Sequence, residues 1–201
     1  MNAAPHADPI AEARHQLGNY LRIYTAEASG LQGLVDQLAD DADNIFDRGN
    51  MRGHITTSAL VYDDRADAIL MIHHKGLARW LQPGGHHEGL QALAVSAARE
   101  VAEETGVVDL SPWPCAPGCE APLDIDTHPI PRNPRKHEGE HVHHDFIYLY
   151  RLSAPVQVRP QWSEVDDVRW MPRDEFGRLP EHRFARLWHK LDARLSGQLR
   201  A

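Results

Sequence analysis

The chain has 201 residues, 42% of them hydrophobic and 25% charged, which are ordinary proportions for a globular protein. Its net charge of −8 argues against a nucleic-acid partner, because nucleic-acid-binding surfaces are usually basic. No apolar run approaches membrane-spanning length, and the first nine residues lack the basic and apolar regions of a secretion signal, so we expect a cytoplasmic protein with no membrane partner.

Residues 1–50 predict a helical extension, which we separate from a main domain in residues 51–201. Residues 1–7 read as a loose end, and Asp8 and Pro9 are typical of an N-cap and a first-turn proline. Apolar residues then recur at helical spacing up to Tyr24, and again from Leu31 after a break at Ser29 and Gly30. We favour a helical hairpin packed on the domain. The alternatives are a lid over the site or an element that forms a homodimer.

Two strands are predicted next, in residues 54–62 and 68–73, separated by a turn at Asp63 and Asp64. Trp80 and Leu81 then lead into a glycine loop, Gly84 and Gly85, whose missing side chains allow backbone to approach a ligand closely.

A helix carrying three carboxylates follows this loop. Glu100, Glu103 and Glu104 stand at i, i+3 and i+4, so they share one helix face and repel one another. A divalent cation would turn this repulsion into a binding site, because Mg²⁺ and Mn²⁺ take oxygen ligands and bind carboxylates together with substrate phosphates. The alternative is an acidic, solvated helix face. Gly106 stands where a left-handed C-cap belongs.

Gly85 and residues 99–107, Arg-Glu-Val-Ala-Glu-Glu-Thr-Gly-Val, together resemble the signature box of the Nudix hydrolases. One position departs from that box: its first glutamate falls on Gln91, which can hydrogen-bond but carries no charge. The opening Gly-Gly-His-x-Glu-Gly also resembles a Nudix subgroup in which that glutamate is commonly replaced. The resemblance implies an α/β fold, a Nudix-type α/β/α sandwich with a mixed sheet, here with the N-terminal helical hairpin and a C-terminal helix added.

Residues 111–140 contain seven prolines, so helix is unfavourable and this is predicted to be the least regular part. Residues 123–128 alternate and predict a short strand with Asp124, Asp126 and His128 on one face. A basic cluster that includes Arg132 follows, either as a solvated loop or as a contact for substrate phosphates.

Residues 141–150 predict a strand that places His141, His143 and Asp145 in one row, which suggests ligand or metal contact. His86 in the glycine loop is a further candidate for this cluster. Nudix enzymes often draw one more acidic metal ligand or base from a downstream strand or loop, and Asp145 is the candidate here. The chain closes with a strand candidate in residues 162–171 and an amphipathic helix from Phe184 to Leu195.

The resemblance implies a metal-dependent hydrolase that cleaves the phosphoanhydride bond of a nucleoside diphosphate linked to another moiety, a small phosphorylated substrate. The cofactor is expected to be Mg²⁺ or Mn²⁺. The predicted metal ligands are Glu100, Glu103, Glu104 and Asp145. Arg99 is expected to hold the glutamates in place, and one of these carboxylates, or Glu138 or Glu140, to take a proton from water. The predicted substrate-binding residues are Gly84, Gly85, His86, Arg132, His141 and His143.

Two alternatives stay open. One is an enzyme similar to type I isopentenyl-diphosphate isomerase, which also has the Nudix fold and places histidines and glutamates around a metal. That family's pattern calls for a catalytic cysteine in a sheet-lined pocket, whereas Cys115 and Cys119, the two cysteines of this chain, lie in the proline-rich segment. The other is a catalytically weak nucleotide-binding module, in which Gln91 marks lost activity.

Overall fold

The computed structural model describes residues 8–40, 45–89, 91–113, 121–134 and 138–197. The helices are α1 (Pro9–Ile23), the 3-10 helix η1 (Thr25–Leu31), α2 (Gln32–Asp40), α3 (Leu93–Thr105), α4 (Arg173–Phe176) and α5 (His182–Leu195). The strands are β1 (His54–Asp63), β2 (Ala68–His74), β3 (Arg79–Leu81), β4 (Gly84–His86), β5 (Leu110–Pro112), β6 (Asp124–Ile130), β7 (His141–Leu152) and β8 (Val165–Pro172). The predicted loose end at residues 1–7 and both cysteines lie outside the described residues.

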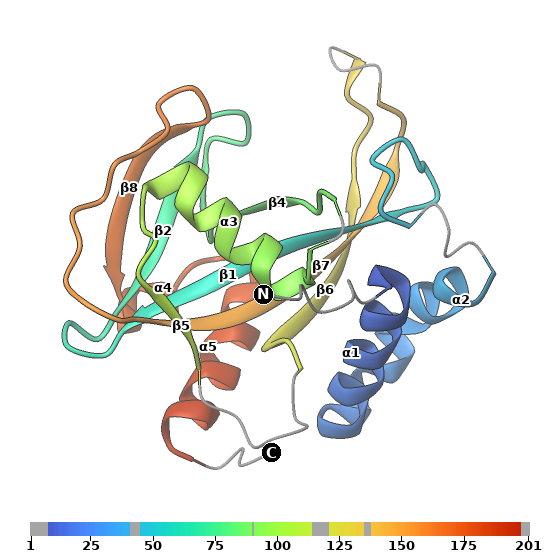
Figure 1. Cartoon of the computed structure of the whole chain (residues 1–201), viewed down its shortest axis with the longest axis horizontal. Helices are drawn as coiled ribbons and strands as arrows, with labels where there is room; N and C mark the ends of the chain where they lie inside the picture. Colours follow the sequence, from blue (N-terminus) through green and yellow to red (C-terminus); the bar gives the residue numbers. More distant parts are fainter. Residues whose placement is uncertain (1–7, 41–44, 90, 114–120, 135–137, 198–201) are drawn as a thin grey trace, which may run out of the picture.

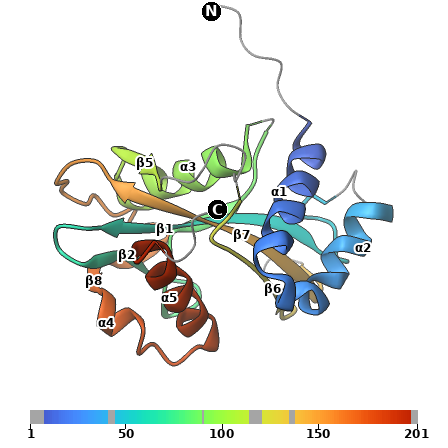
Figure 2. The ribbon, with the colours of Figure 1, turned by 90° about the horizontal axis from the view of Figure 1, so that it is seen from below.

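The strands form one mixed sheet around β1. β1 runs parallel to β7 and antiparallel to β2 and β4. β2 pairs with β8 along one edge and with β1 and β3 along the other, and β7 carries β5 and β6 on the edge away from β1, all antiparallel. The helices cover both faces, with α3 on one side of the sheet and α5 on the other, as Figures 1 and 2 show from two directions. The predicted α/β/α sandwich with a mixed sheet is therefore confirmed.

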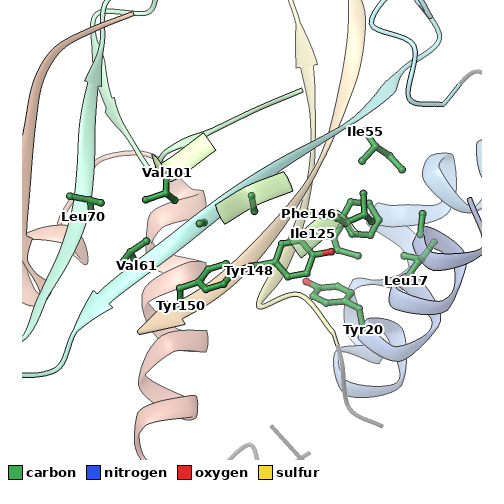
Figure 3. Close-up of a cluster of buried hydrophobic side chains, with 14 of the residues drawn as sticks. Leu17, Tyr20, Ile55, Val61, Leu70, Val101, Ile125, Phe146, Tyr148 and Tyr150 are labelled. Atoms are coloured by element: carbon green, nitrogen blue, oxygen red, sulfur yellow. The ribbon is translucent and has the colours of Figure 1, made fainter. Parts of the chain in front are cut away.

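Strand β1 explains why the sheet needs helices on both faces. Its residues are buried from His54 to Tyr62, because alternate side chains enter two different hydrophobic clusters. Ile55, Ala59 and Val61 pack with Val101 of α3 in the first cluster, part of which is drawn in Figure 3. The intervening Leu60 packs with α5 in the second. Below, the side of the sheet that packs against α3 is called the α3 face, and the side that packs against α5 is called the α5 face.

Helices α1 and α2 pack on the same face as α3. Leu17 and Leu34 are buried in the first cluster together with sheet residues, and the Tyr148 hydroxyl donates to Gln16 Oε1 at 2.6 Å. The structure therefore shows the favoured arrangement, a helical extension packed on the domain. The predicted break at Ser29 and Gly30 is wrong, because these residues lie within η1, which runs directly into α2.

Dimerisation through these helices stays a prediction, as does the boundary near residue 50. Among the described residues, the large hydrophobic side chains that are exposed lie outside α1 and α2, and they are Met51, Leu77, Val95, Val108 and Trp162.

The proline-rich segment is more regular than its composition predicts. It contributes most of β5 and all of β6, which confirms the strand predicted in residues 123–128, and Pro129 lies inside β6 opposite Val142. Among the described strands β6 pairs with β7 alone, so Pro129 can stand where no second neighbour needs its missing N–H. The composition failed as a guide here because proline excludes helix much more strictly than it excludes an edge strand.

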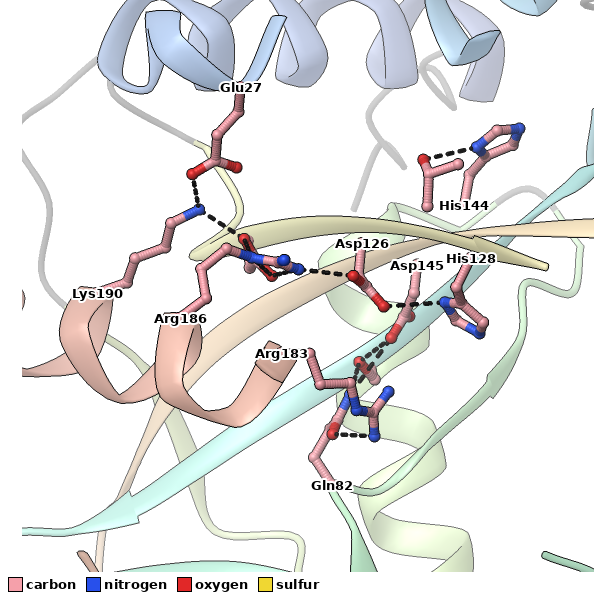
Figure 4. Close-up of polar contacts among 12 residues, drawn as sticks. Glu27, Gln82, Asp126, His128, His144, Asp145, Arg183, Arg186 and Lys190 are labelled. Atoms are coloured by element: carbon pink, nitrogen blue, oxygen red, sulfur yellow. Dashed lines mark hydrogen bonds and ion pairs between the residues drawn. The ribbon is translucent and has the colours of Figure 1, made fainter. Parts of the chain in front are cut away.

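A buried group of charges joins the layers around the β6 edge (Figure 4). Asp124 of β6 is fully buried and accepts hydrogen bonds from Lys190 Nζ at 2.6 Å and from Arg186 at 2.8 to 3.1 Å, both on α5. It also accepts from the Tyr20 hydroxyl of α1 at 2.9 Å, and Lys190 pairs with Glu27 of η1 at 2.7 Å. One aspartate thus connects elements from both ends of the chain.

Candidate active site

Helix α3 carries the predicted glutamates and is held by its apolar face. Leu93, Ala97 and Val101 are fully buried against the sheet. The helix ends at Gly106, whose φ of 72° is left-handed and whose N–H donates to the Ala102 carbonyl at 2.9 Å. This is the predicted C-cap, since glycine adopts that conformation at little cost. The buried face fixes the direction in which the carboxylates project.

The three glutamates are not equivalent. Glu100 and Glu104 are 9% and 3% exposed, whereas Glu103 is exposed. Arg99 donates to Glu103 Oε2 and to Glu100 Oε1, both at 2.6 Å, and to the His86 carbonyl at 3.0 Å. The guanidinium therefore ties two carboxylates to each other and to strand β4, which is the arrangement expected from the sequence.

The glycines of β4 lie directly against these carboxylates. The Gly84 N–H donates to Glu104 Oε2 at 2.9 Å. A methyl group added at Gly85 would lie 2.7 Å from the carboxylate atoms of Glu100, and one added at Gly84 would lie 2.8 Å from the Ser58 Cα. The two positions, predicted as a loop and found in strand β4, therefore need glycine for close approach, and not for a positive φ.

Burial controls the charge of the inner carboxylates. Burial raises the pKa of Glu100 to about 7, against the opposing effect of Arg99. Burial also raises the pKa of Glu104 to about 8, and the nearby Glu100 charge adds to this rise. A cation placed beside them would favour the ionised forms. Arg99 offsets the charge of Glu100 in part, whereas no ion pair with Glu104 occurs among the described residues.

Asp145 is not brought together with the glutamates. It pairs in register with Thr56, so its side chain lies on the α5 face, where it accepts from Ser58 Oγ at 2.7 Å and Thr56 Oγ1 at 3.3 Å. Glu100 lies on the other face of the sheet, against Gly85. The predicted four-residue metal set therefore divides into three glutamates and a separate aspartate, because adjacent strand residues point to opposite faces.

The structure does bring His86, His141 and His143 together, and it adds two histidines that the sequence reasoning did not assign to a site. His54 lies beside His143 across the parallel β1–β7 pair, and His128 lies opposite it on β6. Local pattern could not reveal His54, since only the strand register makes it a neighbour. His128 had a local signal, the alternating row that it forms with Asp124 and Asp126. Arg132 is exposed in the segment that follows β6, and its predicted role in substrate binding stays a prediction.

The sequence matches the NUDIX domain family over residues 52–191, which is more than half of the chain. The chain belongs to the NUDIX domain family. The predicted superfamily, and with it an enzyme of the Nudix pyrophosphohydrolase class, is therefore confirmed. Helix α3 and strand β4 carry the residues that resemble the Nudix box.

Three relatives illustrate how far this likeness extends. The Escherichia coli (strain K12) phosphatase NudJ is 25% identical over 129 residues, covering 61% of this chain and 70% of NudJ. A Caenorhabditis elegans Ap4A hydrolase, solved as a binary complex, has a TM-score of 0.55 at 18% identity and covers 71% of this chain and 98% of its own. The E. coli dihydroneopterin triphosphate pyrophosphohydrolase has a TM-score of 0.51 at 14% identity, and the match covers 68% of this chain and 92% of its own. The two solved structures share the fold with this chain.

The contact between Gly85 and Glu100 leads to a prediction. Replacing Gly85 by alanine should lower kcat by about 10²-fold, because the new methyl group must push the Glu100 carboxylate aside and small displacements of catalytic groups cost that much. The matched control is Gly18→Ala in the middle of α1, where an added methyl group meets nothing within 4 Å. This control should keep full activity and gain about 0.5–1 kcal/mol of unfolding free energy. Steady-state kinetics and urea denaturation of both variants test this prediction. Equal activity in the two variants would show that the contact between Gly85 and Glu100 does not matter for activity.

Proposed function

We propose that this Nudix protein is a divalent-metal-dependent hydrolase that cleaves the phosphoanhydride bond of a nucleoside diphosphate linked to another moiety. The observation that carries the proposal is the pair of buried carboxylates, Glu100 and Glu104. Arg99 and the Gly84 N–H hold them next to strand β4, where an added methyl group at Gly84 or Gly85 would clash.

The donor set fits Mg²⁺ or Mn²⁺. Both ions prefer carboxylate oxygens and share their coordination with substrate phosphates. Glu100, Glu103 and Glu104 would hold the ion. Bound there, a divalent cation supplies neutralisation of phosphate charge and lowers the pKa of water.

The residues of the chain would supply position and proton transfer. Arg99 fixes the Glu100 and Glu103 carboxylates relative to each other, and Gly85 lets the Glu100 carboxylate lie directly against strand β4. Burial raises the pKa of Glu100 to about 7, and a bound cation would favour its ionised, metal-binding form. A carboxylate that does not bind the ion would take the proton from water. Asp145 is a poor candidate for the base, because the sheet lies between it and the glutamates.

The substrate class is supported by the family and by the names of relatives. Two solved relatives are named an Ap4A hydrolase and a dihydroneopterin triphosphate pyrophosphohydrolase. These names are compatible with a nucleotide-like compound that contains a phosphoanhydride bond, which is the class we propose.

The test is a panel of dinucleoside polyphosphates, nucleotide sugars and nucleoside triphosphates, assayed with Mg²⁺, with Mn²⁺ and with a chelator. We expect release of a nucleoside monophosphate or pyrophosphate that requires the metal and stops with the chelator. Tight binding without turnover across the panel would favour the weak binding module instead. Isopentenyl diphosphate is included, because its conversion without phosphate release would favour the isomerase.

A further inference from the structure

Five histidine rings gather on the α5 face of the sheet, where the ends of four strands meet. They come from β1, β4, β6 and β7, and they are His54, His86, His128, His141 and His143. The centroid of the His143 ring lies 4.6 Å from that of His54, 5.5 Å from that of His86 and 5.1 Å from that of His141. The proposed hydrolysis at the Nudix glutamates uses none of the ring nitrogens in this group.

We propose that His54, His86 and His143 bind a zinc ion, at a centre separate from the Nudix glutamates. One ring nitrogen from each lies within 4.8 Å of the others, and among the described residues no other group of three or more histidines, cysteines or carboxylates is so close. Nε2 of His54 is already 3.1 Å from Nε2 of His86. Nitrogens bound at 2.0–2.1 Å to a tetrahedral Zn²⁺ lie roughly 3.3 Å from one another, so modest side-chain rotations complete the site.

The proposed ligand His54 and two neighbouring histidines hold their outer ring nitrogens as metal-binding histidines usually do. Nδ1 of His54 lies 3.3 Å from the Asn50 carbonyl, and Nδ1 of His141 lies 2.9 Å from the Gly139 carbonyl. A carbonyl can only accept, so Nδ1 carries the proton in each ring and the Nε2 lone pair faces the cluster. Metal-binding histidines typically donate their second N–H to a carbonyl or carboxylate in this way. His128, which lies beside the three proposed ligands, likewise has its Nδ1 2.9 Å from a carboxylate oxygen, Asp126 Oδ2.

The ring nitrogens of the cluster also contact one another. Two pairs of Nε2 atoms, His54 with His86 and His141 with His143, face each other at 3.1 and 3.2 Å. In each pair one Nε2 donates and the other accepts, so a bound zinc ion would replace this N–H···N bond.

Strand β4 separates this centre from the Nudix glutamates. Gly85 faces Glu100, whereas the next residue, His86, points its ring to the opposite face. The donor atoms differ as well, because imidazole nitrogens suit Zn²⁺ while carboxylates suit Mg²⁺ and Mn²⁺. Three protein ligands leave a fourth position open, as in zinc sites that bind water or a substrate group. The inference concerns binding and does not depend on the proposed hydrolysis.

The first measurement uses the untagged full-length wild type, stripped with a chelator and dialysed against Zn²⁺ alone. We expect one zinc per chain after removal of free metal. X-ray absorption of the zinc-loaded protein should show imidazole scattering from three ligands. Absence of retained zinc, or a coordination shell made only of carboxylate oxygens, overturns the proposal. This measurement needs no variant, so it decides the question even if substitutions in the buried cluster prevent folding.

Variants then separate the two centres. His143→Ala and His86→Ala should each weaken zinc binding by at least tenfold, as judged from the effects of losing groups that only support a ligand. His189→Ala removes an exposed histidine of α5 outside the cluster and should leave zinc binding unchanged. The double variant Glu103→Gln, Glu104→Gln should still hold one zinc. Loss of zinc from this double variant, with zinc retained by folded His143→Ala, would place the ion at the Nudix helix and overturn the proposal.

Discussion

Replacing Glu103 and Glu104 together by glutamine is expected to lower kcat for phosphoanhydride hydrolysis by about 10³-fold or more. Two of the three carboxylates proposed to bind the metal are then gone, and a divalent ion bound there would supply several kcal/mol of transition-state stabilisation. A loss of about 4 kcal/mol corresponds to about 10³ in rate. The measurement is single-turnover hydrolysis at saturating Mn²⁺, using the best substrate from the panel.

The same double variant should remain folded. Glutamine keeps an oxygen that can accept from the Gly84 N–H, and burial already disfavours the charged form of Glu104, whose pKa is raised to about 8. Asp174→Asn is the matched control, because its carboxylate is 71% exposed on α4 and, among the described residues, forms an ion pair with the equally exposed Arg178 alone. Wild-type rates in the control and in the double variant alike would remove the metal-binding role of α3.

The largest effect on stability is expected from Asp124→Ala, with a loss of about 3–5 kcal/mol in the free energy of unfolding. The carboxylate is fully buried and is shared by Lys190, Arg186 and the Tyr20 hydroxyl. Removing it leaves Lys190, itself 6% exposed, with Glu27 as its one remaining acidic partner among the described contacts. Breaking a buried pair costs this much because an uncompensated charge stays out of water.

The comparison for this prediction is Asp174→Ala, measured by urea denaturation under the same conditions. The Arg178–Asp174 pair has both side chains 71% exposed, so its removal should cost no more than about 1 kcal/mol. Similar losses in the two variants would show that the β6 edge does not hold α1, η1 and α5 together through Asp124.

Individual residues show how much of this protein could be predicted from sequence. The acidic positions of α3, its glycine C-cap and the paired glycines of β4 depend on neighbours close in the chain, so spacing alone located them. The strands on either side were found for the same reason, as alternation is a local property. By contrast, β6 was predicted to end at residue 128, two residues before its observed end, and η1 was mistaken for a break.

Asp145 and His54 mark the limit of that reasoning. Asp145 has the right residue type and follows the Nudix box at a suitable distance, yet the strand register turns it away from the glutamates and towards Ser58. His54 has no local signal, but the same register sets it beside His143.

The sequence by itself determined the family, the acidic helix and the pair of glycines before it, because each of these depends on residues a few positions apart. Only the tertiary structure decided which side of the sheet each remaining candidate lies on, and it divided them into a carboxylate centre and a histidine centre. The physical reason is that the register between distant strands decides which of their side chains share a face of the sheet. A shift of one residue in that register would move each side chain of the strand to the opposite face.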